Sequence, residues 1–509
     1  MVKRMKMKKY IQSMMAFVAI VSFASCSEED NTTLKNESAA KVMTFTATQE
    51  GDEQSTRAAI STDNNKVIVW KYNDQISIFD GTNNKQFTLT DGAGSTSGKF
   101  SGEAEQSTSY TAVYPYQSTA SLSGDDVTNV TLPATQNATD NSFDKNAALM
   151  MAQSDNTTLN FKNVVGYVKV KPKFACSKIV LQAAGASEYL AGRCTLSYGE
   201  GMPSIAFTSE QSKSITLSGK ITANTAYYIA VPAVTLSAGW SISFTDNTGD
   251  VYTRTGSNSI TFKRNTIINL GEFSRTDNNL KLTLTQNGNV PADKQVDMGV
   301  FNIGGTNYRL IFTKSNLTTT GLAASESAYG DYFAWGATEP WYTSYKGTTI
   351  NGWKEGHKSG YASGTAPAFS PEYTSEKDFE MSDDPARKIL GGDWQIPTKA
   401  IWEALVYNSS SKGWESGYKF INNGQTLFLP AAGYVKGTYF QRVGSYGYYW
   451  SGTVYPNFNA YYLYFKSGEV NAQKNYDRDY GCPVRPVRLV EVSAATTTEG
   501  YNVENDFEW

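Results

Sequence analysis

The chain is poor in the residues that most catalytic sites use. Its 509 residues include one histidine, His357, in the polar stretch WKEGHKSGY, which we predict to be a loop. A histidine-based triad would depend on this one loop residue, and a metal site with several histidine ligands is excluded. Enzymes that use only carboxylates pass this test, but no motif indicates one. We therefore predict that the protein is not an enzyme.

Cysteine is also scarce. The four cysteines are Cys26, Cys176, Cys194 and Cys482, and no two have the CxxC spacing of a zinc ribbon or a thioredoxin-type pair. Cys176 and Cys194 lie close enough in sequence to join neighbouring strands by a disulfide, and two buried free thiols are the alternative. Cys482 is then unpaired.

Charge is low and nearly balanced. Charged residues make up 18% of the chain, with 45 Lys and Arg against 48 Asp and Glu, a net charge of -3. This balance lacks the basic excess of nucleic-acid-binding proteins, so we predict no nucleic-acid partner. The abundant residues are 32 Tyr, 10 Trp and 42 Gly. They favour short strands with polar turns, or aromatic binding surfaces.

The first residues are predicted to be an export signal. A basic start precedes the apolar run Met14–Ala24, which is too short to span a bilayer, and no later apolar run is long enough for a transmembrane helix. The ending Phe23-Ala24-Ser25-Cys26 resembles a bacterial lipoprotein signal over residues 1–26. That resemblance implies acylation of Cys26 and a membrane tether. The acidic linker 27–40 begins Ser27-Glu28-Glu29-Asp30 and is similar to tags that export lipoproteins to the cell surface of some Gram-negative bacteria.

Residues 41–275 alternate between apolar and polar positions, as β-strands do. QISIF at Gln75–Phe79, YTAVY at Tyr110–Tyr114 and YYIAV at Tyr227–Val231 are three of these segments, separated by polar or glycine turns. Many short strands without intervening amphipathic helices predict a mainly β protein. We predict two β-sandwich domains, residues 41–153 and 154–275, with the boundary at the polar run AQSDNTT.

Several motifs in this region occur in a recognisable order. They are Trp70-x3-Asp74-x-Ile76-x-Ile78, YTAVYP at 110–115, Leu159-Asn160-Phe161 and KRNTIINLG at 263–271. Together they resemble the fimbrillin-like proteins. The resemblance implies two transthyretin-like β-sandwich domains that build surface pili or anchored adhesins, and possible contacts with other fimbrial subunits by strand addition.

Arg57 gains a meaning from that resemblance. It lies in the polar segment Ser55–Ala59, and fimbrillins mature by cleavage after an arginine in this region. Removal of the first strand would open a groove that another subunit's strand can fill. An ordinary exposed loop arginine is the alternative.

The chain changes character after a predicted linker at 276–294. In residues 295–491, Asp383 is expected to cap a helix that has Pro385 in its first turn, and Thr398 to cap a second helix. The motifs GGDWQIPT (391–398), LPAAG (429–433), YYWSGT (448–453) and GCPVRPVR (481–488) follow in order. They resemble the major paralogous domain of the C-type-lectin-like fold, which is related to formylglycine-generating enzymes and retroelement-diversified variable proteins. The resemblance implies an α+β C-type-lectin-like domain.

The enzymatic relatives need a reactive cysteine pair, and this region contains only Cys482. The sugar-binding motifs of calcium-dependent lectins are also missing, because Glu339-Pro340 is followed by Trp341 and no Trp-Asn-Asp occurs. We therefore predict no cofactor. Calcium held by scattered oxygen ligands remains open.

The strand predicted at Ala460–Lys466 supplies the candidate binding surface. Alternation places Tyr461, Leu463 and Phe465 on one face as core, and Tyr462, Tyr464 and Lys466 on the other as a recognition surface. In the variable proteins this region holds the ligand contacts, and tyrosine gives a large contact area at low entropic cost. A tyrosine-rich surface that serves only sheet packing is the alternative. The predicted ligand-binding residues are Tyr455, Asn457, Phe458, Asn459, Tyr462, Tyr464, Lys466, Asn471, Lys474, Asn475, Tyr476, Asp477, Asp479 and Tyr480.

The acidic tail, residues 492–509, is predicted to be disordered on its composition, and a strand that docks elsewhere is the alternative. The whole pattern predicts a lipid-anchored adhesin on the outer membrane, at a pilus tip or standing alone, that binds a protein or glycan ligand on another surface. The alternatives are a polymerising fimbrial subunit and a lipoprotein that captures glycans.

Overall fold

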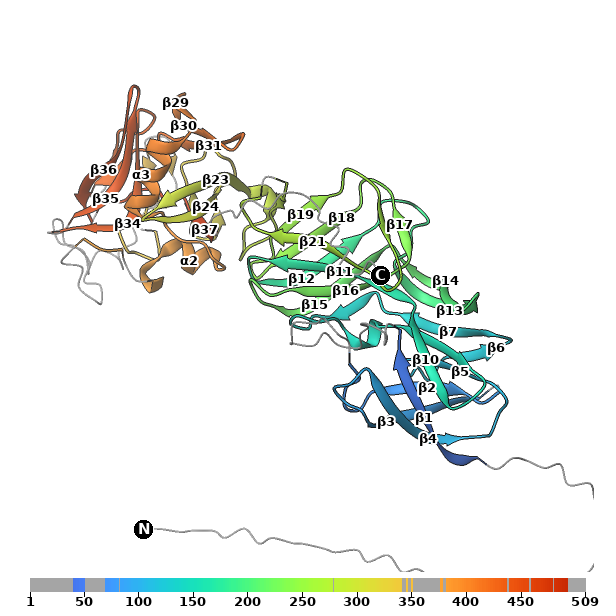
Figure 1. The fold of residues 1–509 in the computed structure, drawn as a ribbon. Coiled ribbons are helices and arrows are strands. Elements are labelled where there is room, and N and C mark those ends of the chain that lie inside the picture. Colours follow the sequence, from blue (N-terminus) through green and yellow to red (C-terminus); the bar gives the residue numbers. More distant parts are fainter. Residues whose placement is uncertain are drawn as a thin grey trace, which may run out of the picture.

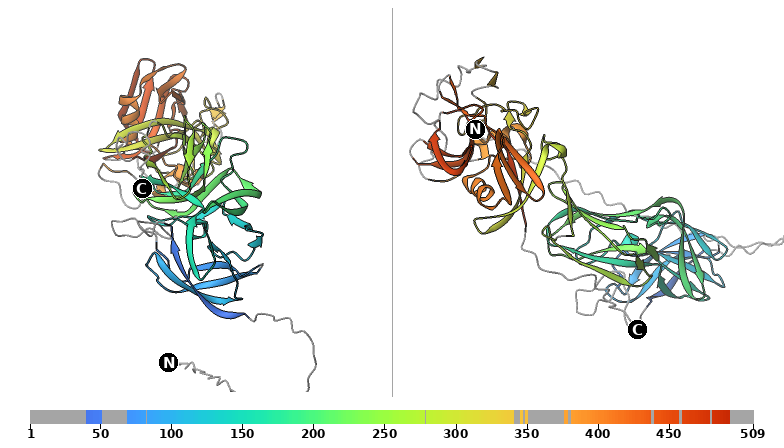
Figure 2. Two further views of the ribbon diagram at one scale, coloured as in Figure 1. Left: turned by 45° about the vertical axis from the view of Figure 1, so that its right-hand side comes forward. Right: turned by 90° about the horizontal axis from the view of Figure 1, so that it is seen from above.

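The computed structural model describes residues 40–50, 69–81, 83–277, 279–340, 345–346, 349–350, 376–378, 381–436, 439–456, 459–478 and 480–492. These residues fold mainly into β-strands. Figures 1 and 2 show three units in a row, with the C-terminal unit at the end remote from the first. Among the helices described, none has the length and hydrophobicity to cross a membrane.

The first unit is a closed barrel rather than the predicted sandwich. Its strands, in barrel order, are β1 (Lys41–Gln49), β10 (Thr158–Asn163), β9 (Met150–Ser154), β5 (Tyr110–Tyr114), β2 (Gln75–Phe79), β3 (Asn84–Asp91) and β4 (Ser97–Ala104). The barrel closes because β1 pairs with β10 on one side and with β4 on the other. Trp70 lies in its core and contacts the rings of Phe100, Tyr114 and Phe161.

The boundary between the first two units differs from the predicted one at 153/154. Strand β10 pairs with β1 and β9, so it belongs to the barrel, and the chain enters the second unit after Asn163. The polar run that indicated a boundary is instead the turn between β9 and β10. Polar turns join strands within a sheet as readily as they join domains, which is why this signal was misleading.

The second unit packs two sheets against each other. The larger sheet has the order β22 (Lys281–Thr283), β19 (Val251–Thr255), β18 (Ser241–Asp246), β12 (Cys176–Gln182), β15 (Ser214–Ile221) and β8 (Thr135–Asn137). The smaller has the order β16 (Tyr227–Pro232), β11 (Val165–Pro172) and β21 (Ile267–Phe273). Val168 and Ile229 of the smaller sheet share a buried core with Ile179 and Phe244 of the larger.

Strands from the first part of the chain interlock the two units. β8 adds to the edge strand β15 of the second unit, and its buried Gln136 exchanges two hydrogen bonds with the backbone of Ala230. A further sheet has the order β14 (Met202–Ser212), β13 (Ala191–Gly199), β7 (Asp126–Leu132) and β6 (Ser121–Ser123). The small pair β17 (Val234–Leu236) and β20 (Ile260–Phe262) and the short 3₁₀ helix η1 (Lys145–Ala147) complete this region.

The two cysteines of this region are free thiols. Cys176 lies in the core of the second unit, whereas Cys194 packs into the core of the first. The disulfide alternative is therefore wrong, because the two side chains belong to different cores. Burial raises the pKa of each thiol to about 12. Cys482 is also free and buried.

The predicted linker 276–294 is part of the folded structure. Its strand β22 pairs with β19 of the second unit. Asn287 donates to the Asp393 carboxylate at 2.8 Å, and its own carbonyls accept from the backbone N–H of Asp393 and the indole N–H of Trp394. The segment therefore joins the second unit to the C-terminal unit through specific contacts.

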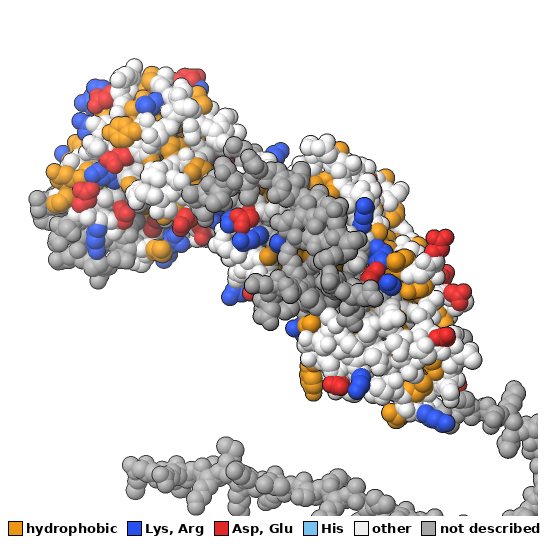
Figure 3. Space-filling view, in the orientation of Figure 1, with side chains coloured by type: hydrophobic (Ala, Val, Ile, Leu, Met, Phe, Trp, Pro, Cys, Tyr) orange, Lys and Arg blue, Asp and Glu red, His pale blue; other side chains and the backbone are white. Residues whose placement is uncertain are grey.

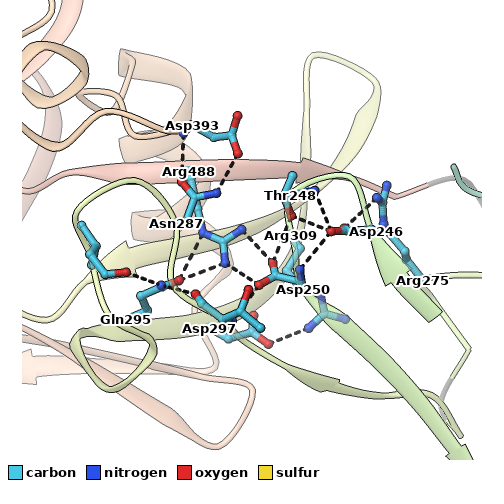
Figure 4. A network of polar contacts seen from close by, with 12 residues as sticks. Asp246, Thr248, Asp250, Arg275, Asn287, Gln295, Asp297, Arg309, Asp393 and Arg488 are labelled. Atoms are coloured by element: carbon cyan, nitrogen blue, oxygen red, sulfur yellow. Dashed lines mark hydrogen bonds and ion pairs between the residues drawn. The ribbon is translucent and has the colours of Figure 1, made fainter. Parts of the chain in front are cut away.

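A buried network of charged and polar side chains lies at this junction (Figure 4). Arg488 of the C-terminal unit donates two hydrogen bonds to the Asp250 carboxylate of the second unit, at 2.8 and 3.1 Å, and both residues are 0% exposed. Gln295 accepts from the same guanidinium at 2.9 Å. Arg275 donates to the Asp246 carboxylate at 2.8 Å and to the Glu491 carbonyl at 3.0 Å. The junction is thus held by paired charges, of which the Arg488–Asp250 pair is excluded from water.

The described residues of the C-terminal unit form several small sheets and two α-helices. One sheet consists of β23 (Gln295–Ile303), β24 (Thr306–Thr313) and β37 (Val487–Glu491), and another of β29 (Ser411–Trp414), β30 (Gly417–Asn422) and β31 (Gln425–Pro430). A two-stranded sheet pairs β32 (Tyr434–Lys436) with β33 (Tyr439–Gln441). A further three-stranded sheet consists of β34 (Tyr446–Tyr455), β35 (Asn459–Lys466) and β36 (Glu469–Asp477). Short pairs are β25 (Leu317–Thr318) with β26 (Gly321–Leu322), and β27 (Tyr345–Lys346) with β28 (Thr349–Ile350). The short helices η2 (Ala292–Lys294) and η3 (Met381–Asp383) precede β23 and the first α-helix.

The two α-helices are α2 (Pro385–Leu390) and α3 (Lys399–Asn408). Thr398 caps α3 as predicted, accepting from the backbone N–H of Ile401. The cap of α2 is Asp384 rather than Asp383, because the Asp384 carboxylate accepts from two N–H groups of the first turn. Buried Trp402 of α3 donates to the carbonyl of Trp450, which fixes α3 against β34.

Candidate functional site

The sheet β34–β35–β36 lies at the end of the molecule remote from the barrel (Figure 1). One of its faces is core: Tyr449, Leu463 and Phe465 are 0% exposed and share a cluster with Trp402 and Leu405 of α3. This confirms the predicted inward orientation of Leu463 and Phe465. Because side chains alternate along a strand, the intervening residues lie on the face turned away from α3.

That second face carries connected tyrosine rings, which we call the tyrosine face. Strand pairing places Tyr448 opposite Tyr464 and Trp450 opposite Tyr462. Ring contacts with centroid distances of 4.4–6.3 Å link the whole set. Aromatic pairs of this kind contribute about 0.5–1.5 kcal/mol each beyond their buried area. The tyrosine face consists of Tyr434, Tyr446, Tyr448, Tyr462, Tyr464, Tyr476 and Tyr480.

The rings differ in how much of each reaches water. Tyr464 and Tyr476 are half-buried, as are Tyr434 and Tyr446. Tyr462 is only 5% exposed, so its prediction as an outward recognition residue is wrong. It is covered because Tyr448, Trp450 and Tyr476 pack against it. Tyr480 is buried to the same extent.

Burial favours the neutral form of several phenols of this face. Burial raises the pKa of Tyr448 and of Tyr462 well above the usual value for tyrosine, and the neighbouring phenols raise both further. Burial also raises the pKa of Tyr434, with Tyr476 adding to the effect. Neutral phenols can both donate and accept hydrogen bonds, so the exposed edges present polar groups without negative charge.

Three exposed cations surround these rings. Lys436 lies over Tyr480, Arg442 over Tyr446 and Lys474 over Tyr464, at 5.1, 5.2 and 5.8 Å from the ring centroids. None of them forms an ion pair with an acidic side chain of the described residues. Such positions are favourable for a cation but leave its hydrogen-bond donors available.

Other predicted residues lie on this face or near it. Lys466 forms an ion pair with Glu469 at 3.2 Å, and both side chains are partly exposed. Asn471 pairs with Tyr464 across the strands, and its side-chain carbonyl accepts from the backbone N–H of Gln473. These two polar side chains already have partners within the chain.

The remaining described predictions lie on the opposite face. Asn459 donates to Asn475 at 2.9 Å, and Asp477 is the cross-strand partner of Asn459. Tyr455, 37% exposed, packs edge to face on Tyr461. The predicted set is therefore divided between two faces of one sheet rather than gathered into one site. Cys26, Arg57, Asn457, Phe458 and Asp479 lie outside the described residues.

Five residues of the site were not predicted as contacts: Tyr434, Lys436, Arg442, Tyr446 and Tyr448. The segment YGYYW at 446–450 carried a signal for two of them, because its alternation places Tyr446 and Tyr448 together with Trp450. Tyr434, Lys436 and Arg442 come from the β32–β33 hairpin and the turn after it. No local pattern in the sequence brings that hairpin beside β34.

Within the described residues, no group of three or more His, Cys, Asp or Glu side chains is placed to hold a metal ion. Basic, acidic and hydrophobic side chains are interspersed over the C-terminal unit in the view of Figure 3. The tyrosine face is therefore a candidate surface for recognition, with ring edges, phenol hydroxyls and cations as its contact groups.

Comparisons with known proteins give local matches. A family model described as "Domain of unknown function (DUF8237)" matches residues 395–487, which include all seven tyrosines of the tyrosine face. No curated protein matches the chain at a significant level.

Solved structures similar to this chain come from adhesion and fimbrial proteins. A proposed cell adhesion protein from Bacteroides uniformis is 16% identical, with a TM-score of 0.31, covering 47% of this chain and 95% of that chain. A fimbrial protein from Bacteroides ovatus is 12% identical, with a TM-score of 0.26, over 87% of this chain and 97% of that chain. The tip fimbrial protein Mfa3 from Porphyromonas gingivalis, truncated at its C-terminus, is 9% identical, with a TM-score of 0.20, over 48% and 98%. These TM-scores are too low to establish a shared fold.

Proposed function

We propose that this protein is a cell-surface adhesin that binds a ligand on another surface through the tyrosine face. The observation that carries the proposal is the combination of half-buried neutral tyrosines with three exposed, unpaired cations on one face of a sheet. Tyrosine and arginine are enriched where proteins bind partners, because they offer contact area and hydrogen bonds together. The packed rings also hold the contact groups in place before binding, which lowers the entropic cost of association.

The position of the face agrees with this role. It lies at the far end of the three units from the barrel, which is the unit nearest the N-terminus in sequence (Figure 1). Acylation of Cys26 at the outer membrane, as the lipoprotein resemblance implies, would tether the opposite end. The proposed C-type-lectin-like unit would then stand furthest from the membrane.

Adhesion by beads coated with the purified chain tests the proposal. On a layer of epithelial cells, Tyr464→Ala is expected to weaken adhesion several-fold, because it removes a half-buried ring between Tyr446 and Tyr448. The matched control is Tyr72→Ala, which removes a tyrosine that is 79% exposed on the barrel unit. Circular dichroism should show both variants folded. Equal adhesion by the two variants would overturn the proposal.

A second candidate function, subunit polymerisation, is favoured by the position of β1. This strand fills the space between β4 and β10, and Phe45, Ala47 and Gln49 are buried along it. Its loss would leave an apolar groove between two strand edges, which strand addition from another subunit can fill.

Cleavage after Arg57 would be the step that releases this strand. The end of β1 is also tied to the second unit, because Glu50 forms an ion pair with Arg264; a further ion pair, with Lys162 of β10, lies within the barrel. Electron microscopy after cleavage by an arginine-specific protease separates the two functions. Filaments would support polymerisation, and monomers would support a stand-alone or tip adhesin.

A further inference from the structure

We propose that the ligand of the tyrosine face is an acidic glycan, a polysaccharide with carboxylate or sulfate groups on successive units. This inference rests on the proposed function and adds the chemical class of the ligand. It starts from the cations, because an unpaired cation near a binding surface favours an anionic partner.

The cations come from separate elements and converge on one face. Lys436 ends β32, Arg442 lies in the turn before β34, and Lys474 lies in β36. The Arg442 carbonyl accepts from the backbone N–H groups of Ser445 and Tyr446, which holds this turn against the sheet. Lys466 differs from these three cations, because it already forms an ion pair with Glu469. Lys436, Arg442 and Lys474, which have no acidic partner among the described residues, therefore remain available to a ligand.

The spacing of the rings indicates more than one acidic group. Lys474 lies over Tyr464 and Lys436 over Tyr480, the first and last rings in a row of ring-to-ring contacts that runs through Tyr448 and Tyr434. Successive centroids in this row are 5.6, 4.7 and 5.6 Å apart. A ligand that reaches both lysines is longer than one ring and carries charge near both ends. A repeating acidic polysaccharide has this arrangement.

The tyrosines favour a polyhydroxylated ligand over a base-stacking one. The rings cover one another's faces in part, because Tyr434 packs at 61° to Tyr448, Tyr448 packs at 73° to Tyr464, and Tyr434 stacks on Tyr480 at 16°. Nucleobases stack on open aromatic faces, which this packing covers. Phenol hydroxyls can exchange hydrogen bonds with sugar hydroxyls. Their neutrality at physiological pH adds no repulsion toward an anionic chain.

An acidic peptide is the nearest competing ligand. Extended peptides bind mainly by adding a strand to a free sheet edge, with side-chain pockets for specificity. The three cations, however, lie over tyrosine rings and come from the β32–β33 hairpin, the turn after it and β36, not from a single strand edge. This placement favours a chain that lies across the face.

Binding of the purified full chain to defined polymers tests the inference. The probes are chondroitin sulfate and polygalacturonate, with dextran as the neutral polysaccharide, and poly-glutamate and single-stranded poly-dT as other anionic classes. We expect binding to both acidic polysaccharides, weakened by added salt, and much weaker binding to dextran, poly-glutamate and poly-dT. Arg442→Gln/Lys474→Gln is expected to lower affinity for chondroitin sulfate by about tenfold.

The matched control is Lys388→Gln/Lys412→Gln. It removes the same charge from two exposed lysines of α2 and β29, on the same unit but outside the tyrosine face. We expect less than a threefold change in affinity for this pair. An equal loss in both double variants would show a general charge effect and overturn the inference. Preference for poly-glutamate, poly-dT or dextran would overturn it as well.

The two proposals fail in different ways. If Tyr464→Ala abolishes cell adhesion but acidic polysaccharides bind no better than dextran, the tyrosine face binds a ligand of another class. If Tyr464→Ala adheres as the Tyr72→Ala control does, the proposed function itself is wrong.

Discussion

Arginine and lysine occupy two contrasting environments in this protein. At the junction between the second and C-terminal units, Arg488 is 0% exposed and fully engaged with Asp250 and Gln295. On the tyrosine face, Arg442 and Lys474 are exposed and rest only against aromatic rings, within the part of the chain that the structure describes. A buried pair that is complete resists change, because breaking it leaves a charge without water. An exposed cation without an acidic partner has little effect on the free energy of unfolding, and it can form a new ion pair with a ligand.

The largest effect is expected from removing Asp250, the acidic partner of Arg488 at the junction. Asp250→Ala leaves the Arg488 guanidinium buried, with Gln295 as its one hydrogen-bond partner among the described residues, and is expected to lower the free energy of unfolding by about 3–5 kcal/mol. Urea unfolding of the full chain measures the change. Asp250→Leu/Arg488→Met, which removes both charges, should recover most of the loss. A single variant as stable as the parent would contradict the structural role of the pair.

The buried phenols of the tyrosine face should make the stability of the protein depend on pH in the alkaline range. Because burial raises the pKa of Tyr462 above the value of about 10 in the unfolded chain, the folded protein keeps this proton where the unfolded chain has lost it. The free energy of unfolding therefore falls above pH 10, by about 1.4 kcal/mol per pH unit for this group. Tyr462→Phe should flatten this slope.

Urea unfolding at pH values from 9 to 11.5 would measure this dependence of the free energy of unfolding on pH. Tyr72→Phe serves as the control, since Tyr72 is 79% exposed and should leave the slope unchanged. Identical slopes for the Tyr462 variant and the parent would mean that this phenol is not held neutral by the fold.

The smallest effect is expected at the exposed ion pair between Lys466 and Glu469, beside the tyrosine face. Glu469→Gln removes the partner of Lys466, an exposed pair, and should change the free energy of unfolding by only about 0–1 kcal/mol. It also turns a paired cation into an unpaired one beside the face. Affinity for chondroitin sulfate should rise modestly, and surface plasmon resonance would detect the gain. A decrease would indicate that Glu469 itself contacts the ligand.

Local patterns predicted the local structure well. The alternating segments at Gln75–Phe79 and Tyr110–Tyr114 are strands with those bounds, and Thr398 caps its helix. The closing of the barrel and the placement of β8 in the second unit were not predicted. Both depend on pairings between strands far apart in sequence, such as β1 with β10 and β8 with β15, which no periodicity encodes.

The candidate site shows the same division. Alternation along β35 correctly separated Leu463 and Phe465 from Tyr462 and Tyr464, because orientation on a strand is a local property. Exposure is not local: Tyr462 is covered by rings from β34 and β36. The cations at 436 and 442 were missed for the same reason, since only the tertiary structure brings their hairpin to the sheet.

The interlocking of the first two units has a mechanical consequence. β8 continues the sheet of the second unit beside β15, and β7 pairs with β13, so backbone hydrogen bonds join strands that lie on both sides of the crossover at Asn163. A stretching force applied between the C-terminal end and the barrel cannot separate these units at a flexible hinge. Separating them would require rupture of both ladders. The first two units would therefore transmit tension to the C-terminal unit without coming apart.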